Sequence, residues 1–130
     1  MDLGNNILTQ AAINAQTTSA GTVTGSAIER TKYEGSVFTC FIGSIYGSPD
    51  ATTVTFTIKE CDTEAGTYTS ITNASAVITD TNDRAEIAVD LNPIEAYVKA
   101  EAVVSFSGGS SPYAIIGSEA IFSGAKVYPI

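Results

Sequence analysis

The side chains of this sequence that are best suited to chemistry are carboxylates gathered in two predicted turns. These are Glu60, Asp62 and Glu64 in the first turn, and Asp80, Asn82 and Asp83 in the second. Oxygen ligands of this kind bind calcium, which makes each turn a candidate metal site. Acidic residues and Asn are also what solvated β-turns ordinarily contain, and neither stretch has the spacing of the twelve-residue calcium loop. We therefore expect no metal site, with calcium at the first turn as the alternative.

Other residues that catalysis commonly uses are missing or isolated. The chain has no His, which removes the commonest general base, the serine triad and most transition-metal sites. Cys40 and Cys61 do not form the CxxC pair that zinc sites use. No helical pattern follows Gly108-Gly109, as a phosphate-binding loop would require. A glycosidase cleft usually carries aromatic sugar platforms, and the chain has no Trp. We expect no catalytic residue, no enzyme activity and no cofactor.

Composition narrows the class of protein further. The 130 residues suffice for one domain with a core, and 14 acidic against 6 basic residues give a net charge of −8. Because nucleic-acid binding needs clustered Lys and Arg, we expect no nucleic-acid partner. No stretch approaches the ~20 apolar residues of a membrane helix, so we expect no membrane partner. Asp2 stands where a signal peptide needs a basic residue, which predicts synthesis in a cytoplasm and reduced thiols.

Alternating residues predict an antiparallel β-protein. Between Thr52 and Lys59, apolar and Thr side chains alternate with the period of a strand. Similar runs separated by turn signals predict about eight strands, at 26–31, 36–43, 52–59, 67–71, 76–79, 85–91, 97–107 and 113–122. This spacing is typical of a β-sandwich, here expected to be jelly-roll-like, although the strand order does not follow from it. We expect a hairpin loop at 80–83 and pairing of 113–122 with 97–107.

The first twenty residues differ from the rest of the chain. Their apolar residues allow about two helical turns, but Gly4, Asn5 and Asn6 are poor helix formers, so an extended arm is the alternative. Such an arm docks either on its own domain or on a neighbour. The expected organisation is an N-terminal arm at 1–20 and a single β-sandwich domain at 21–130.

Three stretches of the sequence resemble a known family. The first is the pattern E-C-D-x-x-x-G-x-Y-x-x-I, which runs from Glu60 to Ile71. The second is the leader Asp2–Ala20, and the third is Glu95-Ala96-Tyr97-Val98-Lys99, where a basic residue is commoner than Ala96. In this order and at this chain length, they resemble the head decoration or cement proteins of tailed bacteriophages, which are small β-sandwich virion proteins.

The resemblance implies a virion structural protein that binds the outer surface of the phage head and stabilises it. Its expected partners are the major capsid protein and further copies of itself in a homo-oligomer, and its expected location is the capsid surface. Two alternatives stay open: a tail or head–tail adaptor protein, and a carbohydrate-binding β-sandwich, which would use Tyr46 or Tyr113. Apolar groups near the ends, with one tyrosine near a loop and one near the C-terminal end, are the candidate partner interface: Leu3, Ile7, Leu8, Tyr46, Val127, Tyr128 and Ile130. Tyr68 and Tyr97 are expected in the core.

Overall fold

The computed structural model describes residues 7–31, 33–91 and 94–123. These residues form nine β-strands and no helix, which confirms the all-β prediction. The strands are β1 (Ile7–Thr18), β2 (Gly21–Thr24), β3 (Ile28–Glu29), β4 (Gly35–Tyr46), β5 (Ala51–Cys61), β6 (Thr69–Ile78), β7 (Asp83–Asp90), β8 (Tyr97–Ser107) and β9 (Tyr113–Ser123).

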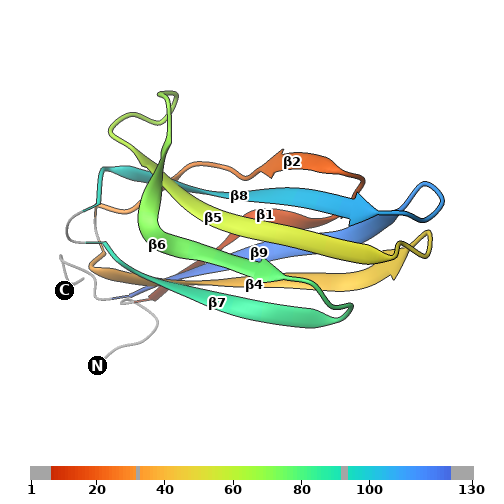
Figure 1. The fold of residues 1–130 in the computed structure, drawn as a ribbon. Coiled ribbons are helices and arrows are strands. Elements are labelled where there is room, and N and C mark those ends of the chain that lie inside the picture. The colour runs from red at the N-terminus through yellow and green to blue at the C-terminus, as the bar shows by residue number, and fades with distance from the viewer. Residues whose placement is uncertain (1–6, 32, 92–93, 124–130) are drawn as a thin grey trace.

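The strands form two antiparallel sheets packed face to face (Figure 1). The four-stranded sheet has the order β1-β9-β4-β7. The five-stranded sheet has the order β2-β8-β5-β6, and β3 also pairs with β8. The chain is thus one long hairpin, with β1 on β9, β2 and β3 on β8, β4 on β7, and β5 on β6 at its tip. This hairpin is rolled so that β4 also meets β9 and β5 also meets β8, which is a jelly roll.

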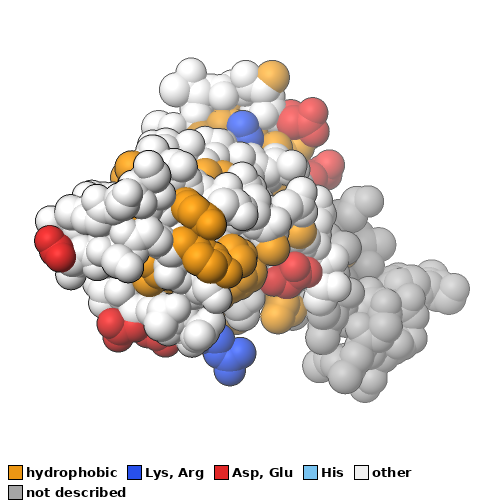
Figure 2. Space-filling model, turned by 90° about the vertical axis from the view of Figure 1, so that its right-hand side faces the viewer, with side chains coloured by type: hydrophobic (Ala, Val, Ile, Leu, Met, Phe, Trp, Pro, Cys, Tyr) orange, Lys and Arg blue, Asp and Glu red, His pale blue; other side chains and the backbone are white. Residues whose placement is uncertain are grey.

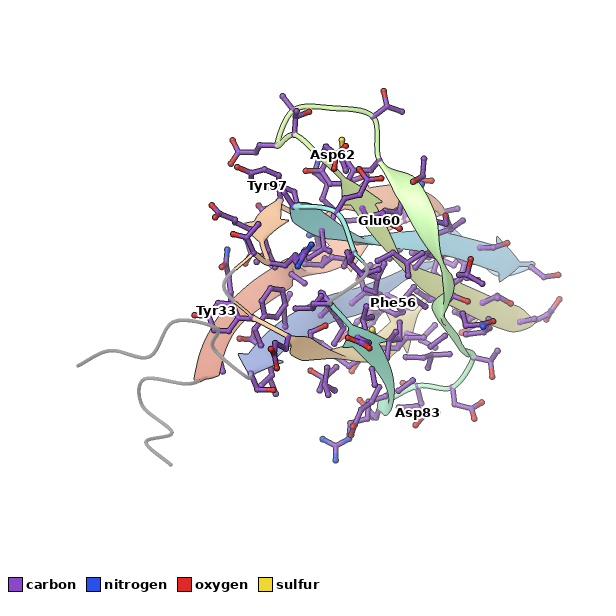
Figure 3. The ribbon with its side chains drawn as sticks, turned by 90° about the vertical axis from the view of Figure 1, so that its left-hand side faces the viewer. Tyr33, Phe56, Glu60, Asp62, Asp83 and Tyr97 are labelled. Carbon is purple, nitrogen blue, oxygen red and sulfur yellow. The ribbon has the colours of Figure 1, made fainter. Side chains whose placement is uncertain are left out.

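The core lies between the two sheets because every second residue of the central strands is apolar. In β4 the buried side chains are at even positions, including Phe38, and in β9 they include Phe122. The ring of Phe122 meets Phe38 edge-to-face at 6.0 Å between centroids, and meets Tyr33 at 5.7 Å. Phe56 of β5 completes this buried layer from the five-stranded sheet (Figure 3). Burial of these inner faces is the main force that joins the sheets.

The described part of the predicted N-terminal arm is extended and docks on its own domain. Residues 7–18 are strand β1, which pairs with β9 from Ile7 opposite Ser123 to Thr18 opposite Ala114. The helical alternative is therefore wrong for this stretch. The physical reason is that β9 would otherwise leave a row of backbone groups unpaired at the sheet edge. Register shifts on either side of Ile13 let both Ala12 and Ile13 face the core.

Two of the expected local pairings are wrong. The 79–82 segment joins β6 of the five-stranded sheet to β7 of the four-stranded sheet, so it is not the loop of a paired hairpin. Strand β9 does not pair with β8, because residues 108–112 carry the chain to the other sheet. In a rolled hairpin the partners of a strand are distant in sequence, so turn signals alone do not identify them. The predicted neighbours β5 and β6 do pair.

Replacing a ring of the buried layer should lower the stability of the fold. We expect Phe38→Ala to reduce the free energy of unfolding by about 3–5 kcal/mol, because a cavity is left where both sheets meet. Val103→Ala, at a side chain that is 44% exposed, is the matched control and should cost less than about 1 kcal/mol. Urea unfolding followed by circular dichroism measures both. Equal losses for the two variants would contradict the assignment of the core.

The two cysteines are free and buried, as the sequence predicts. The Sγ of Cys40 lies 3.7 Å from the Oγ of Ser118 inside the core. The pKa of the Cys40 thiol is raised to about 11, because burial raises it by more than the hydrogen bond to Ser118 lowers it. Since the thiolate is the reactive form, Cys40 is shielded both by its surroundings and by its protonation.

We therefore expect Cys40 to resist alkylation at pH 8 in the folded protein and to react once the protein is denatured. Mass spectrometry after iodoacetamide treatment, without reductant, should find two labels on the denatured chain. Finding none would indicate a disulfide, and labelling of Cys40 in the folded protein would contradict its burial.

Candidate interaction surface

The outer faces of the two sheets differ in chemistry. On the five-stranded sheet, the middle of the outer face carries Thr53, Thr55 and Thr57. Lys59 and Glu101 form an ion pair at 3.1 Å on the same face. This surface is the polar exterior that a two-layer sandwich ordinarily presents to water, although Val77 and Val103 interrupt it on either side of Thr55.

The outer face of the four-stranded sheet is apolar along its two central strands. In β4 as far as Ile42, and in β9, the even-numbered residues face the core, so the odd-numbered ones point outward. The half-buried outward residues that form this apolar strip are Val37, Phe41, Ile115 and Ile121. Polar residues interrupt the strip at Thr39 and Glu119, which pair across the two strands.

Two glycines let the larger side chains of the strip lie flat on the sheet. A Cβ at Gly117 would come within 2.5 Å of the Phe41 ring and 3.2 Å of the Ala15 backbone, so the ring covers this glycine. A Cβ at Gly43 would lie 3.4 Å from the Cβ of Ile115. Phe41 and Ile115 therefore occupy the space that side chains at Gly117 and Gly43 would need.

A pair of tyrosines ends the strip. Tyr46 of β4 stands opposite Tyr113 of β9, and their rings stack with centroids 4.8 Å apart and planes 19° apart. The side chains are 42% and 37% exposed, respectively. The register shift between Ile42 and Ile45 turns Ile45 toward the core and Tyr46 outward.

The structure places the predicted interface residues in different regions. Tyr46 lies at the tyrosine end of the sheet. Ile7 and Leu8 lie in β1 opposite Ser123 and Phe122, at the other end of the sheet. At about 3.3 Å a residue along β9, Ser123 is roughly 33 Å from Tyr113. Leu3, Val127, Tyr128 and Ile130 lie outside the described residues. The structure thus does not bring Tyr46 together with Ile7 or Leu8.

Sequence reasoning missed the apolar strip, although a signal for it was present. The run Ser36–Gly43 is almost continuously apolar instead of alternating, which is the pattern of a strand covered on both faces. The expectation that Tyr68 and Tyr97 belong to the core is wrong. Both are half-buried. The Lys99 ammonium lies over the Tyr68 ring, with its Nζ 4.3 Å from the centroid of the ring. The Tyr68 hydroxyl donates to the Glu64 carbonyl at 2.8 Å.

Hydrogen bonds connect Glu60, at the start of the first acidic turn, and Arg30 to residues 94–95, which precede β8. Glu60 Oε1 accepts a hydrogen bond from the Glu95 backbone N–H at 3.0 Å, and Arg30 donates to the carbonyls of Ile94 and Glu95. A side-chain hydrogen bond with Asp62, together with partial burial and the charges of Asp62 and Glu60, raises the pKa of the Glu95 carboxyl. Figure 3 shows Glu60, Asp62 and Tyr97 near this turn, with Asp83 apart from them.

The acidic side chains of the two turns are not gathered into one cluster in the part of the chain that the structure describes. No group of three or more Cys, Asp or Glu side chains there is arranged to hold an ion. No described residue belongs to a helix long and apolar enough to cross a membrane.

The fold is similar to that of proteins from viral particles. A protein in the structure of the infectious bursal disease virus T13 particle matches with a TM-score of 0.62 and 18% identity, over 95% of this chain and 32% of that one. The VP2 subviral particle of the same virus gives a TM-score of 0.61 at 18% identity, over 95% and 34%. The chain thus spans about a third of the length of the viral proteins that it matches.

A prophage protein of similar size has a related fold. The SPBc2 prophage-derived protein YomS matches with a TM-score of 0.52 and 15% identity, over 92% of this chain and 94% of its own. No protein-family model and no curated protein matches the sequence. At these identities the likeness shows a shared jelly-roll fold.

The link between Asp62 and Glu95 should loosen as the pH rises. A carboxyl with a raised pKa in the folded protein contributes stability at pH values below its unfolded pKa of about 4.3, and this contribution is lost as the pH rises through the raised value. We expect hydrogen exchange of residues 62–68, corrected for the intrinsic rate, to become faster between pH 4 and pH 7. Glu95→Gln keeps an N–H donor but has no proton to lose, so its corrected exchange should change less. Identical pH profiles for the wild type and Glu95→Gln would contradict the raised pKa of the Glu95 carboxyl.

Proposed function

We propose that this protein is a virion structural protein, a decoration or cement protein that binds the outer surface of a tailed-phage head and stabilises it. The observation that carries the proposal is a jelly-roll fold similar to that of a viral-particle protein, combined with an apolar outer face on the four-stranded sheet. The proposed partners are the major capsid protein and further copies of the chain. Under this proposal the protein has no catalytic role, in keeping with the absence of His from its sequence.

The apolar strip is the surface proposed to make the contact. The strip lies in the middle of an outer face of four strands, about 4.8 Å apart and roughly 36 Å long, which presents on the order of 700 Å². The whole face is thus near the ~800 Å² per partner of a standard interface, and the two strands of the strip make up about half of it. The half-buried strip residues would lose their remaining exposure there. A net charge of −8 keeps the free protein soluble before assembly and opposes binding to nucleic acid. Many copies on one shell would add avidity to a modest contact.

Two pairs of substitutions distinguish the two outer faces. We expect the double variant Val37→Thr with Ile121→Thr to bind heads at least about tenfold more weakly, because these cross-strand neighbours lie within the strip. The matched control is Val77→Thr with Val103→Thr, which makes the same kind of change on the other outer face. Co-sedimentation with heads assembled from a major capsid protein encoded beside this chain measures both. Equal affinities for the two variants would place the contact elsewhere.

The chain ends need a separate test, because residues 7–13 are part of β1 and cannot be removed without damage to the sheet. Deleting 1–6 or, separately, 124–130 should leave the fold intact, and at least one deletion should weaken binding to heads. If both deletions bind as the intact chain does, the terminal contact is wrong. A copy number far below that of the capsid protein, with no affinity for heads, would overturn the decoration proposal in favour of a tail or adaptor protein.

A further inference from the structure

The tyrosine end of the sandwich is hollowed. A hollow of about 480 Å³ lies between the turn from β1 to β2 and the loop from β8 to β9, lined by Ser19, Ala20, Phe106, Gly108, Ser111 and Pro112. Figure 2 faces this end and shows hydrophobic side chains near its middle, with acidic ones toward its margin. The volume is within the range of small-ligand sites, about 300–1,000 Å³. Its lining combines an aromatic ring with serine hydroxyls.

The loops around the hollow are held in place by hydrogen bonds. The Ser110 N–H donates to the Gly47 carbonyl at 2.8 Å, and the Asp50 N–H donates to the Ser107 carbonyl at 2.6 Å. Gly108 and Gly109 have φ of +72° and +83°, a conformation that other residues rarely adopt. The Asp50 carboxylate lies directly against Gly108, so an acceptor group borders the hollow. These contacts make the site largely preformed.

The stacked tyrosines follow the lining of this hollow along the chain and are partly exposed. Pro112 of the hollow is followed directly by Tyr113. Strand β7 pairs with β4 only as far as Ile42, and β1 pairs with β9 only as far as Ala114. The β4 and β9 residues that carry the rings therefore extend beyond the paired parts of both edge strands. This position explains why two large aromatic side chains in central strands remain more than a third exposed.

We propose that this end of the protein binds a neutral oligosaccharide, with one sugar unit in the hollow and another against the tyrosine pair. Sugars present apolar C–H faces, which pack on aromatic rings, and hydroxyls, which donate to carboxylates and exchange hydrogen bonds with Ser. A chain of net charge −8, with Asp50 at the rim, disfavours anionic glycans. The site is separate from the central part of the apolar strip, so binding does not depend on the proposed attachment to a head.

The test is an array of neutral and anionic glycans probed with the full chain, followed by calorimetry on the neutral oligosaccharide with the strongest signal. We expect binding in the micromolar to millimolar range. Tyr113→Ala and Tyr46→Ala should each weaken it at least tenfold, and Asp50→Asn at least threefold. Tyr113→Phe, which keeps the ring, should stay within threefold of the wild type. Tyr68→Ala, at the opposite end of the sandwich, is the control and should bind as the wild type does.

Three outcomes would overturn the proposal: no neutral glycan bound below 10 mM, binding of anionic glycans alone, or unchanged affinity in both Tyr→Ala variants. A thermal melt identifies any variant that fails to fold. Asp50→Asn then carries the test, because it keeps the volume of the side chain, and Tyr113→Phe serves as its folded control. If Asp50→Asn binds as the wild type does, the assignment of Asp50 and the hollow is wrong.

Discussion

Strand β9 is the element on which the other parts of the structure depend, because it is hydrogen-bonded along both edges. It pairs with β1 on one side and with β4 on the other, and so links the first described strand to the middle of the chain. One of its faces supplies Ile116 and Phe122 to the core, and the other supplies Ile115 and Ile121 to the apolar strip. A shift of one residue would exchange these two faces, so the register of β9 determines the core and the outer surface together.

The difference between the two outer faces connects the fold to its proposed role. A sandwich needs apolar residues only between its sheets, and the Thr-rich face of the five-stranded sheet follows this rule apart from Val77 and Val103. The four-stranded sheet departs from it, with Phe41 lying over Gly117 and Ile115 against Gly43. Part of this packing stabilises the sheet itself. Val37, Phe41, Ile115 and Ile121 remain half-buried, and their exposed part is what the proposed contact with a head would bury.

The two ends of the sandwich also differ, and for a topological reason. A rolled hairpin gathers the turn between β5 and β6 at one end, where Asp62 raises the pKa of the Glu95 carboxyl, and the loops that follow β4 and β8 at the other. At the second end, hydrogen bonds join the loops around a hollow whose lining includes Pro112, the residue before Tyr113. One domain thus offers a flat apolar face and a concave end, and the two can serve different ligands without competing for the same residues.

Much of this protein could be predicted from local pattern alone. The alternation of Thr52–Lys59 determined a strand and its buried side, because a period of two leaves one arrangement that buries Val54, Phe56 and Ile58. The absence of His limited the available chemistry in the same direct way. Tyr46 and Tyr113 could be named as exposed candidates from their places beside turn signals, but nothing in their spacing showed that they face each other.

The tertiary structure decided everything that joins distant residues. Whether β9 pairs with β8 or with β1 and β4 depends on which arrangement buries both inner faces at once, and this is a property of the whole chain. The same holds for the extended form of Ile7–Thr18, which is favoured by the open edge of β9 and not by its own residues. Glu95 lies 33 positions from Asp62, so the effect of Asp62 on the pKa of the Glu95 carboxyl is equally invisible to local pattern. Local spacing sets which way a side chain points, while burial and backbone pairing summed over the whole molecule set what it meets.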